Sequence, residues 1–322
     1  MDIVWLIVGL VLILVGADAL TDGASAVAKR WGVSDLVVGL TVVAFGTSAP
    51  ELAISLVSAV KGSAPMAVGN VVGSNIFNVL VIIGLVAVIK PVRIQGSIMF
   101  NELPLVILSS LALLAVGSGN ILGVEGERIL TRPEGILFLL FFIIFMRYTF
   151  SQARSGSQPD PGAGMVSGKP LMPLWKSLLW IAGGLAGLVW GGDRFVAGAS
   201  GIASSLGMSD ALIGLTIVAA GTSLPELATS VVAAGKGKPG IAVGNVIGSN
   251  IFNIFLVLGL TGTIMPLPFG GITVADLLVM TGASVLFWIF GWKFAERTVT
   301  RWEGGALLAL YVAYICWQVA MI

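Results

Sequence analysis

The sequence predicts an all-α membrane protein of ten transmembrane helices, arranged as two inverted five-helix repeats. Apolar runs of about 20 residues, the length that crosses a bilayer, recur from end to end of the chain. Of its 322 residues 57% are hydrophobic and only 10% are charged, whereas a soluble domain carries about 25% charged residues. A stretch of 40 residues also occurs twice, at 39–78 and 214–253, with a constant offset of 175 residues and 28 identical positions.

The apolar runs predict ten spans with soft boundaries. They are residues 3–28, 36–60, 66–89, 101–117, 130–148, 174–203, 211–235, 240–265, 272–291 and 303–321. A segment rich in Ser, Gly and Pro at 151–170 has no apolar run, and we expect a cytoplasmic linker there. It separates a first half, 1–150, from a second half, 171–322. Because five spans is an odd number, the second repeat enters the membrane in the opposite sense, as in secondary transporters with midplane substrate sites.

Lys and Arg residues in short loops predict the orientation. Thirteen of the 17 fall on one side of the predicted membrane, and Arg194 is ambiguous within the sixth span. That side should be cytoplasmic, so both termini are expected outside, with the protein in a prokaryotic plasma (inner) membrane. The start of the chain lacks the positive charge of a signal peptide, so the first span should be retained.

Composition excludes several classes of site. The chain has no histidine and a single cysteine, Cys316, which leaves no internal disulfide, no Cys/His metal cluster and no His-based catalysis. A net charge of +1 gives no indication of a nucleic-acid partner. No protein partner is evident either, and the lipid bilayer is the expected surrounding.

The first copy of the repeat places polar side chains beside residues that break helices. It contains G-T-S-A-P-E at 46–51, where Thr47, Ser48 and Glu51 share one helix face. Pro50 lacks an N–H and clashes with the carbonyl of Gly46, which frees carbonyl oxygens near the carboxylate. Ionisable groups in membrane helices are costly and mark functional sites by default.

The second copy repeats this pattern with the equivalent residues Thr222, Ser223 and Glu226. The span after each motif carries G-N-V-x-G-S-N-I-F-N, in which polar residues spaced by four form a stripe on one helix face. The stripes consist of Asn70, Ser74 and Asn78 in the first copy, and of Asn245, Ser249 and Asn253 in the second. The neighbouring glycines are expected to let another helix approach closely.

These side chains offer hard oxygen ligands of the kind that Ca²⁺ takes, and the same oxygens can hold Na⁺. Two facing carboxylates repel each other in low dielectric. Either one divalent cation or several monovalent cations would neutralise them, so occupancy by the two ions is mutually exclusive. That exclusion is the physical basis of antiport. Mg²⁺ fits less well because it dehydrates reluctantly.

The paired motifs resemble the α-repeats of the cation/calcium antiporter superfamily, in particular the sodium/calcium exchanger branch of prokaryotic type. The resemblance implies alternating access around a four-site cluster and no resident cofactor, with Ca²⁺ and Na⁺ as transported ions. It implies that Glu51 and Glu226 bind both ions and that the carbonyls of Thr47 and Thr222 help to hold Ca²⁺. It assigns Na⁺ sites to Ser48, Ser74, Ser223, Ser249 and the carbonyls of Ala44 and Ala219, and it turns Asn78 and Asn253 toward the centre.

Departures from the family pattern discriminate among its branches. Potassium-dependent relatives carry Asp at the position of Asn253, which disfavours K⁺ co-transport. Proton/calcium relatives place an acidic residue shortly after the G-N of this span, and none follows Asn70 or Asn245, which favours Na⁺ over H⁺. A proton-coupled Ca²⁺ antiporter remains the alternative.

Two other classes fit the sequence less well. An intramembrane hydrolase using Ser48 or Ser223 would need a base, and neither motif contains a His or Lys; we therefore expect no enzymatic activity. A passive channel would not need paired broken helices that both carry a carboxylate. The sequence leaves open whether Asp18 and Asp193, which recur at the repeat offset, lie on an ion-access path.

Overall fold

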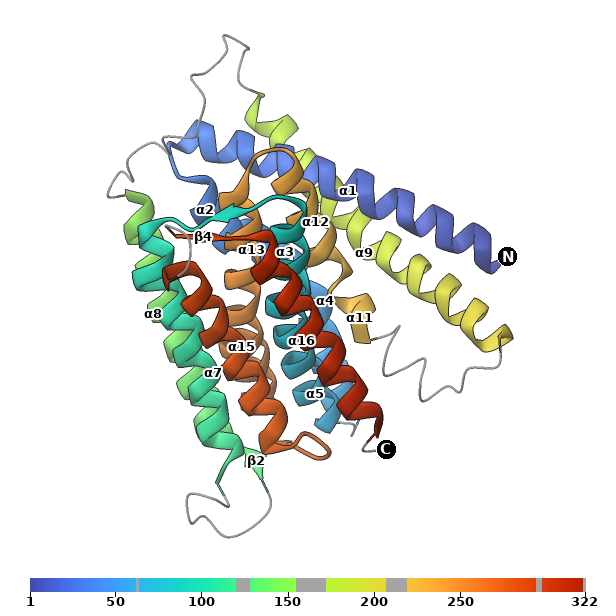
Figure 1. Cartoon of the computed structure of the whole chain (residues 1–322), viewed down its shortest axis with the longest axis vertical. Coiled ribbons are helices and arrows are strands. Elements are labelled where there is room, and N and C mark those ends of the chain that lie inside the picture. The colour runs from blue at the N-terminus through green and yellow to red at the C-terminus, as the bar shows by residue number, and fades with distance from the viewer. Residues whose placement is uncertain (62–63, 120–127, 155–171, 207–218, 294–296, 321–322) are drawn as a thin grey trace. The chain divides into compact units, whose positions relative to one another are not determined.

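The computed structural model describes residues 1–61, 64–119, 128–154, 172–206, 219–293 and 297–320 (Figure 1). The chain forms two compact units, each built from both halves of the sequence. Unit 1 comprises Met1–Ser48 and Ile144–Gly248, and unit 2 comprises Ala49–Ile143 and Ser249–Ile322. The division into halves 1–150 and 171–322 follows the duplication in the sequence and stays a prediction. Most of the predicted linker, from residue 155 onward, lies outside the described residues.

The described secondary-structure elements of unit 1 are all helices. Its elements are α1 (Asp2–Trp31), α2 (Asp35–Val38), the π-helix η1 (Gly39–Val43), α3 (Ala44–Thr47), α9 (Leu174–Ser205), α11 (Ala219–Thr222) and α12 (Leu224–Gly235). Two further helices contribute residues to both units, namely α8 (Arg132–Arg154) and α13 (Pro239–Ile251).

Glycines allow α1 and α9 to pack closely along their length (Figure 1). Gly9 and Gly16 on α1, and Gly184 and Gly191 on α9, recur every seven residues on the contacting faces. A Cβ added at Gly16 would lie 2.7 Å from the carbonyl oxygen of Gly184, and the reverse distance is also 2.7 Å. Only glycine permits this backbone approach, a device common in membrane helix pairs.

Unit 2 contains the remaining helices and four short strands. The helices are α4 (Ala49–Val60), α5 (Ala64–Phe77), η2 (Asn78–Ile83), α6 (Gly84–Ile89), η3 (Ile98–Glu102), α7 (Leu103–Gly117), η5 (Phe252–Leu258), α14 (Gly259–Ile264), α15 (Val274–Lys293) and α16 (Arg301–Ala320). The strands are β1 (Val92–Arg93), β2 (Ile129–Leu130), β3 (Leu267–Pro268) and β4 (Thr298–Val299).

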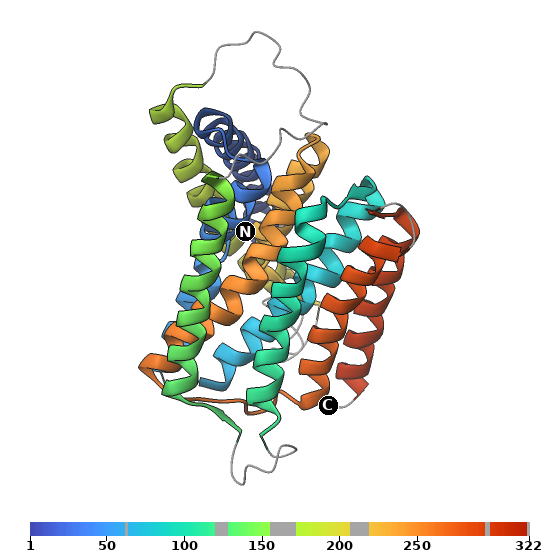
Figure 2. The same ribbon diagram turned by 90° about the vertical axis from the view of Figure 1, so that its left-hand side faces the viewer.

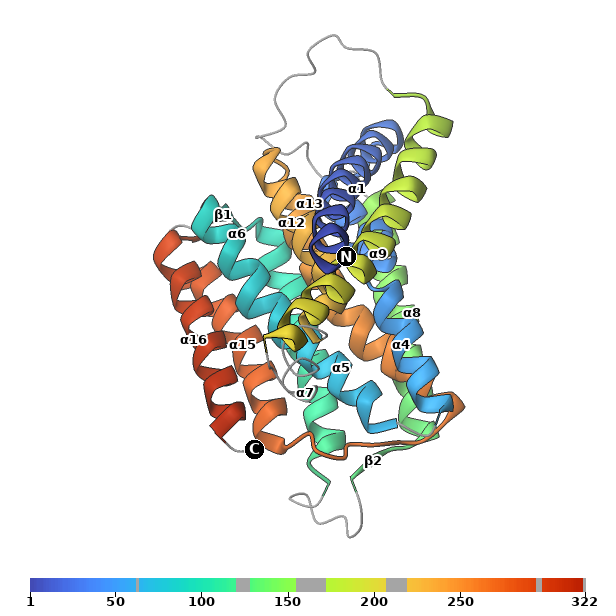
Figure 3. The same cartoon turned by 90° about the vertical axis from the view of Figure 1, so that its right-hand side faces the viewer.

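Elements from the two sequence halves alternate within unit 2. Strand β1 pairs antiparallel with β4, with Val92 opposite Val299, and β2 pairs antiparallel with β3, with Leu130 opposite Leu267. Helix α15 packs on α7 (Figure 2), and α16 packs on α6 and η2 (Figure 3). The duplicated halves are therefore interleaved in this unit rather than stacked as separate bodies.

Eight helices of the described chain are long and apolar enough to cross a membrane. Residues 35–47 and 49–60, which meet at a bend of 41°, pass the same test only when they are taken together. The expected seventh span, 211–235, is described only from Ala219, so the total of ten stays a prediction. The secondary structure itself repeats at the sequence offset: α3, α4 and α6 recur 175 residues later as α11, α12 and α14.

Candidate cation-binding site

The predicted helix breaks are confirmed at the same place in both repeats. Ser48, between α3 and α4, has φ −83° and ψ 3°, and Ser223, between α11 and α12, has φ −91° and ψ 8°. A ψ near zero lies outside the α-helical range. Pro50 and Pro225 each follow two residues later, where the missing N–H cannot continue the hydrogen bonding of the preceding turn.

Unit 1 brings a hydroxyl of the first repeat to the carboxylate of the second. The Ser48 hydroxyl donates to Glu226 Oε1 at 3.1 Å. Glu226 is fully buried and Ser48 is 3% exposed. Ser223, the residue that directly precedes α12, is also fully buried. These oxygens lie in a water-poor interior, where their interaction with a cation would be strong.

The predicted carbonyl ligands of unit 1 lie in the short helices beside the breaks. The Ala44 carbonyl accepts the Ser48 N–H at 3.0 Å and the Thr47 hydroxyl at 3.4 Å. It therefore takes part in the helix while lying next to the break. Ala219 and Thr222 are the first and last residues of α11, the repeat equivalents of Ala44 and Thr47, and Thr222 is half-buried.

Unit 2 holds the other five predicted ligands, on helices that contact one another. Helices α4, α5 and η5 pack pairwise. Four of these ligands lie on α5, η2, α13 and η5, and each is at most 2% exposed. The fifth is a glutamate in the first turn of α4, and it is fully buried. The five residues are Glu51, Ser74, Asn78, Ser249 and Asn253.

Two π-helical segments coincide with the predicted asparagines. The first, η2, begins at Asn78, and the second, η5, has Asn253 as its second residue. The π-helices are rare, and they concentrate at functional sites. Here they change the direction of the side chains that follow the α-helical stripe.

No group of three or more Asp, Glu or Cys side chains that could hold a metal ion occurs within the described ranges. The predicted ligands combine neutral hydroxyl, amide and carbonyl oxygens with two carboxylates. The predicted residue set supplies this mixture, which suits Ca²⁺ and Na⁺.

Asn70 and Asn245 brace the two glutamate-bearing helices through their amide nitrogens. Asn245 Nδ2 donates to the Glu226 carbonyl at 3.2 Å and to Ser230 Oγ at 3.0 Å. Asn70 makes the equivalent bonds to the Glu51 carbonyl at 3.4 Å and to Ser55 Oγ at 3.2 Å. Because the pattern is the same in both units, each glutamate is held by the helix that follows it.

Asn75 and Asn250 join the site region although the sequence stripe passed over them. Asn78 Nδ2 donates to Asn250 Oδ1 at 3.0 Å, and Asn253 Nδ2 donates to Asn75 Oδ1 at 3.1 Å. The signal that could have found them is their identity in the two copies, directly after Ser74 and Ser249.

Asp18 lies in an ion pair at the end of α12. Lys236 Nζ lies 2.7 Å from Asp18 and 2.8 Å from Asp22, and Lys238 lies 3.1 Å from Asp22. Burial favours the neutral form of Lys236, but hydrogen bonds to the two carboxylates outweigh it and raise the pKa of this lysine. The repeat equivalent Asp193 instead pairs with its neighbour Arg194 at 3.0 Å.

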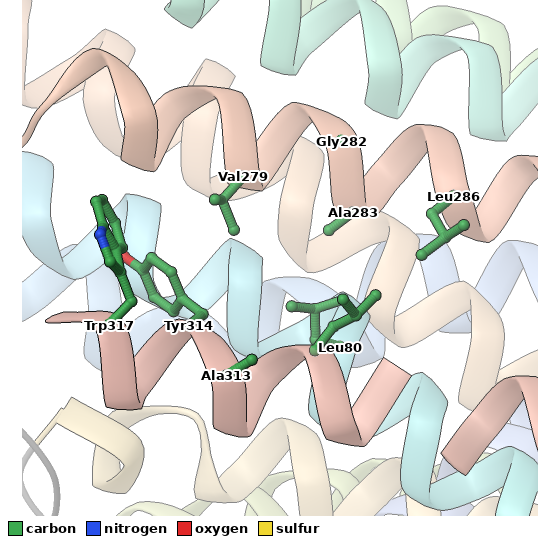
Figure 4. Close-up of a pocket in the computed structure, with 9 residues that line it drawn as sticks. Leu80, Val279, Gly282, Ala283, Leu286, Ala313, Tyr314 and Trp317 are labelled. Carbon is green, nitrogen blue, oxygen red and sulfur yellow. The ribbon is translucent and has the colours of Figure 1, made fainter. Parts of the chain in front are cut away.

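A cavity of about 360 Å³ in unit 2 is unsuited to cations. It lies between α15 and α16, with Leu80 of η2 on its wall, and Figure 4 shows Tyr314 and Trp317 at one end and Leu286 at the other. Its lining is almost wholly apolar, and the one hydroxyl there, of Tyr314, is hydrogen-bonded to Asp276 at 2.9 Å. None of the predicted ligands lines it.

Comparison with known proteins identifies the family. The family model described as sodium/calcium exchanger protein matches residues 1–151 and 176–320, which is nearly the whole chain. The chain belongs to the sodium/calcium exchanger family. It is 39% identical to CaxA of Alkalimonas amylolytica over 318 residues, covering 97% of this chain and 96% of CaxA. It is 34% identical to the sodium/calcium exchanger MaX1 of Methanosarcina acetivorans, with 96% of each chain covered.

A solved structure extends the likeness to the fold. The structure of the sodium-calcium exchanger NCX_Mj matches with a TM-score of 0.81 and 32% identity, covering 98% of this chain and 97% of that one. The predicted all-α membrane fold with repeats is thereby confirmed. A cation/calcium antiporter is the class of protein that family and fold support, and a transporter family argues against the intramembrane hydrolase.

Proposed function

We propose that this exchanger-family protein moves Ca²⁺ in one direction and Na⁺ in the other by alternating access. The observation that carries the proposal is the duplicated motif with a buried carboxylate, Glu51 and Glu226, in each copy. Every other predicted side-chain ligand is a neutral hydroxyl or amide oxygen. Two negative charges neutralise one Ca²⁺ or two Na⁺.

Charge also explains why the two ions should exclude each other. A Ca²⁺ and a full set of Na⁺ bound together would leave excess positive charge in low dielectric, where repulsion is poorly screened. Two carboxylates left without any cation would repel each other, which opposes closure around an empty site and limits leak. Exchange rather than one-way flow follows from these two costs.

The proposed ligands are the residues of the duplicated motifs. The carboxylates and Thr carbonyls would hold Ca²⁺, and the hydroxyls with the Ala carbonyls would hold Na⁺, while the two asparagines face the bound ion. The set consists of Glu51, Glu226, Thr47, Thr222, Ser48, Ser223, Ser74, Ser249, Ala44, Ala219, Asn78 and Asn253.

Apolar residues after the G-N pairs support Na⁺ over H⁺ as the coupling ion. Val71 and Val72 follow Asn70, Val246 and Ile247 follow Asn245, and all four are at most 1% exposed. A titrating carboxylate at these positions would offer a proton carrier, and apolar side chains do not. The proton-coupled Ca²⁺ antiporter is the second candidate, and it differs from the first only in the coupling ion.

Isothermal titration of Ca²⁺ into the purified protein at rising Na⁺ tests the proposal. Choline replaces Na⁺ so that ionic strength stays constant. Apparent Ca²⁺ affinity should fall as Na⁺ rises, and the fall should weaken in Ser74→Ala and Ser249→Ala, with affinity in choline changed much less. Ser109→Ala, a fully buried serine that donates to the Val106 carbonyl on α7, is the matched control. Ca²⁺ affinity that does not depend on Na⁺ would rule the mechanism out.

A further inference from the structure

Four buried asparagines of unit 2 form a two-fold related amide cluster. Asn75 and Asn250 are repeat equivalents, as are Asn78 and Asn253, and all four are at most 2% exposed. The Asn78 amide donates to Asn250 Oδ1 at 3.0 Å, and the Asn253 amide donates to Asn75 Oδ1 at 3.1 Å. Each repeat therefore supplies one acceptor to the other.

A backbone carbonyl fixes the direction of the Asn75–Asn253 half of this cluster. Asn75 Nδ2 donates to the main-chain oxygen of Asn250 at 3.2 Å, and a carbonyl oxygen accepts hydrogen bonds but cannot donate them. The amide nitrogen of Asn75 must therefore lie on that side, which leaves its Oδ1 facing Asn253. Asn253 in turn has to present Nδ2 to Asn75, so its own Oδ1 is directed away from the cluster.

The two amide oxygens directed away are the unusual feature. Asn78 Oδ1 and Asn253 Oδ1 are buried and accept no hydrogen bond from any residue in the described ranges. Buried polar atoms are almost always hydrogen-bonded, so two equivalent exceptions in the two repeats call for an explanation. An amide oxygen held rigidly with an unused lone pair is a ready ligand for Ca²⁺ or Na⁺.

We infer that Asn75 and Asn250 are positioning residues, which hold the amide oxygens of Asn253 and Asn78 toward the transported cation. The inference rests on the proposed function and adds two residues to it that do not touch the ion. Without its acceptor on Asn75, the Asn253 amide could rotate and present Nδ2, a donor that repels a cation. Substitution of a residue that hydrogen-bonds to a metal ligand typically lowers metal affinity about 10- to 100-fold.

The test is Ca²⁺ titration of Asn75→Leu in two backgrounds. In the natural sequence the substitution should lower Ca²⁺ affinity about 10- to 100-fold. In an Asn253→Asp background both side-chain oxygens are acceptors, so orientation no longer matters, and Asn75 Oδ1 would repel the carboxylate. Asn75→Leu should therefore leave Ca²⁺ affinity unchanged or raise it there.

A merely structural role gives a different pattern. If Asn75→Leu only disturbs packing, it lowers Ca²⁺ affinity by the same factor in both backgrounds, and that result overturns the inference. Unchanged affinity in the natural background also overturns it. Should Asn75→Leu fail to fold, Asn250→Leu tested with and without Asn78→Asp gives the same comparison from the other repeat. Absence of Ca²⁺ binding by the unsubstituted protein would instead count against the proposed function.

Discussion

The Ser48 hydroxyl donates a hydrogen bond to Glu226 at 3.1 Å, although 178 positions separate the two residues in the sequence. Both lie in unit 1. Ser48 lies at the helix break of its repeat, and Glu226 lies in the first helical turn after the break of the other. The carboxylate of one motif is thus held by the hydroxyl of the other. A cation could replace this hydrogen bond, because each oxygen would then exchange one buried polar contact for another.

Removing the charge of either glutamate should abolish Ca²⁺ exchange. Glu226→Gln keeps the shape and an acceptor oxygen for Ser48 but deletes one of the two charges that balance Ca²⁺. Breaking a buried charge pair costs about 3–5 kcal/mol, so Ca²⁺ binding should weaken at least a hundredfold. Glu51→Gln should behave in the same way. For both variants, isothermal titration measures Ca²⁺ binding and ⁴⁵Ca²⁺ flux measures exchange.

Glu134→Gln is the matched control for those variants. This carboxylate lies on the first turn of α8, where it accepts from the Thr131 N–H and hydroxyl, each at 2.7 Å, and it belongs to neither motif. Glu134→Gln should therefore leave Ca²⁺ exchange intact. Normal Ca²⁺ flux in folded Glu226→Gln would sink the assignment of the site.

Asn245 should matter to stability as well as to the site. It is fully buried, accepts from the Thr47 hydroxyl at 3.0 Å, and donates to Ser230 and to the Glu226 carbonyl. Asn245→Leu removes partners from buried polar groups, which should lower the free energy of unfolding by about 1–3 kcal/mol. Asn70→Leu should cost less, because Asn70 is only half-buried. Unfolding monitored by tryptophan fluorescence in detergent gives both values, and an unchanged midpoint for Asn245→Leu would contradict the bracing role.

The helix breaks could be predicted from sequence because their cause is local. Pro50 and Gly46 act on the turn that contains them, and Ser48 takes the non-helical conformation that they impose. The fold class could also be predicted, because the apolar runs and the duplication are visible in the sequence itself.

The asparagine cluster could not be predicted, because its cause is tertiary. The spacing of four placed Asn70, Ser74 and Asn78 on one α-helical stripe and left Asn75 off it. The π-helix at Asn78 departs from that spacing, and the partner of Asn75 lies in the other repeat. The pairing of Asp18 with Lys236 was likewise invisible in the sequence, since 218 positions separate them.

The Lys236 ion pairs should stabilise unit 1 modestly and over a defined pH range. Because the folded-state pKa of Lys236 is raised above its ordinary 10.5, the stabilisation is complete below that value and is lost as pH rises through the folded-state pKa. Lys236→Gln should lower the free energy of unfolding by less than about 1 kcal/mol, since the partner carboxylates are partly exposed. Thermal unfolding should show a constant difference from about pH 7 to about pH 9. A difference that vanishes within that range would contradict the assigned pairs.

Both termini are predicted to face the periplasm or exterior, from the distribution of Lys and Arg. Alkaline phosphatase fused after Ile322 should be active, because that enzyme requires the oxidising side of the membrane. The same reporter fused after Ser151, at the predicted cytoplasmic linker, should be inactive. The opposite pair of results would invert every loop of the proposed topology.

Uptake of ⁴⁵Ca²⁺ into proteoliposomes under different counter-ion gradients tests the central claim most directly. Vesicles loaded with Na⁺ should accumulate Ca²⁺, vesicles loaded with choline at the same ionic strength should not, and Glu226→Gln should remove the Na⁺-driven component. An outward Na⁺ gradient is therefore predicted to be both necessary and sufficient. Accumulation driven by a proton gradient in the complete absence of Na⁺, at the rate seen with Na⁺, would contradict sodium/calcium exchange.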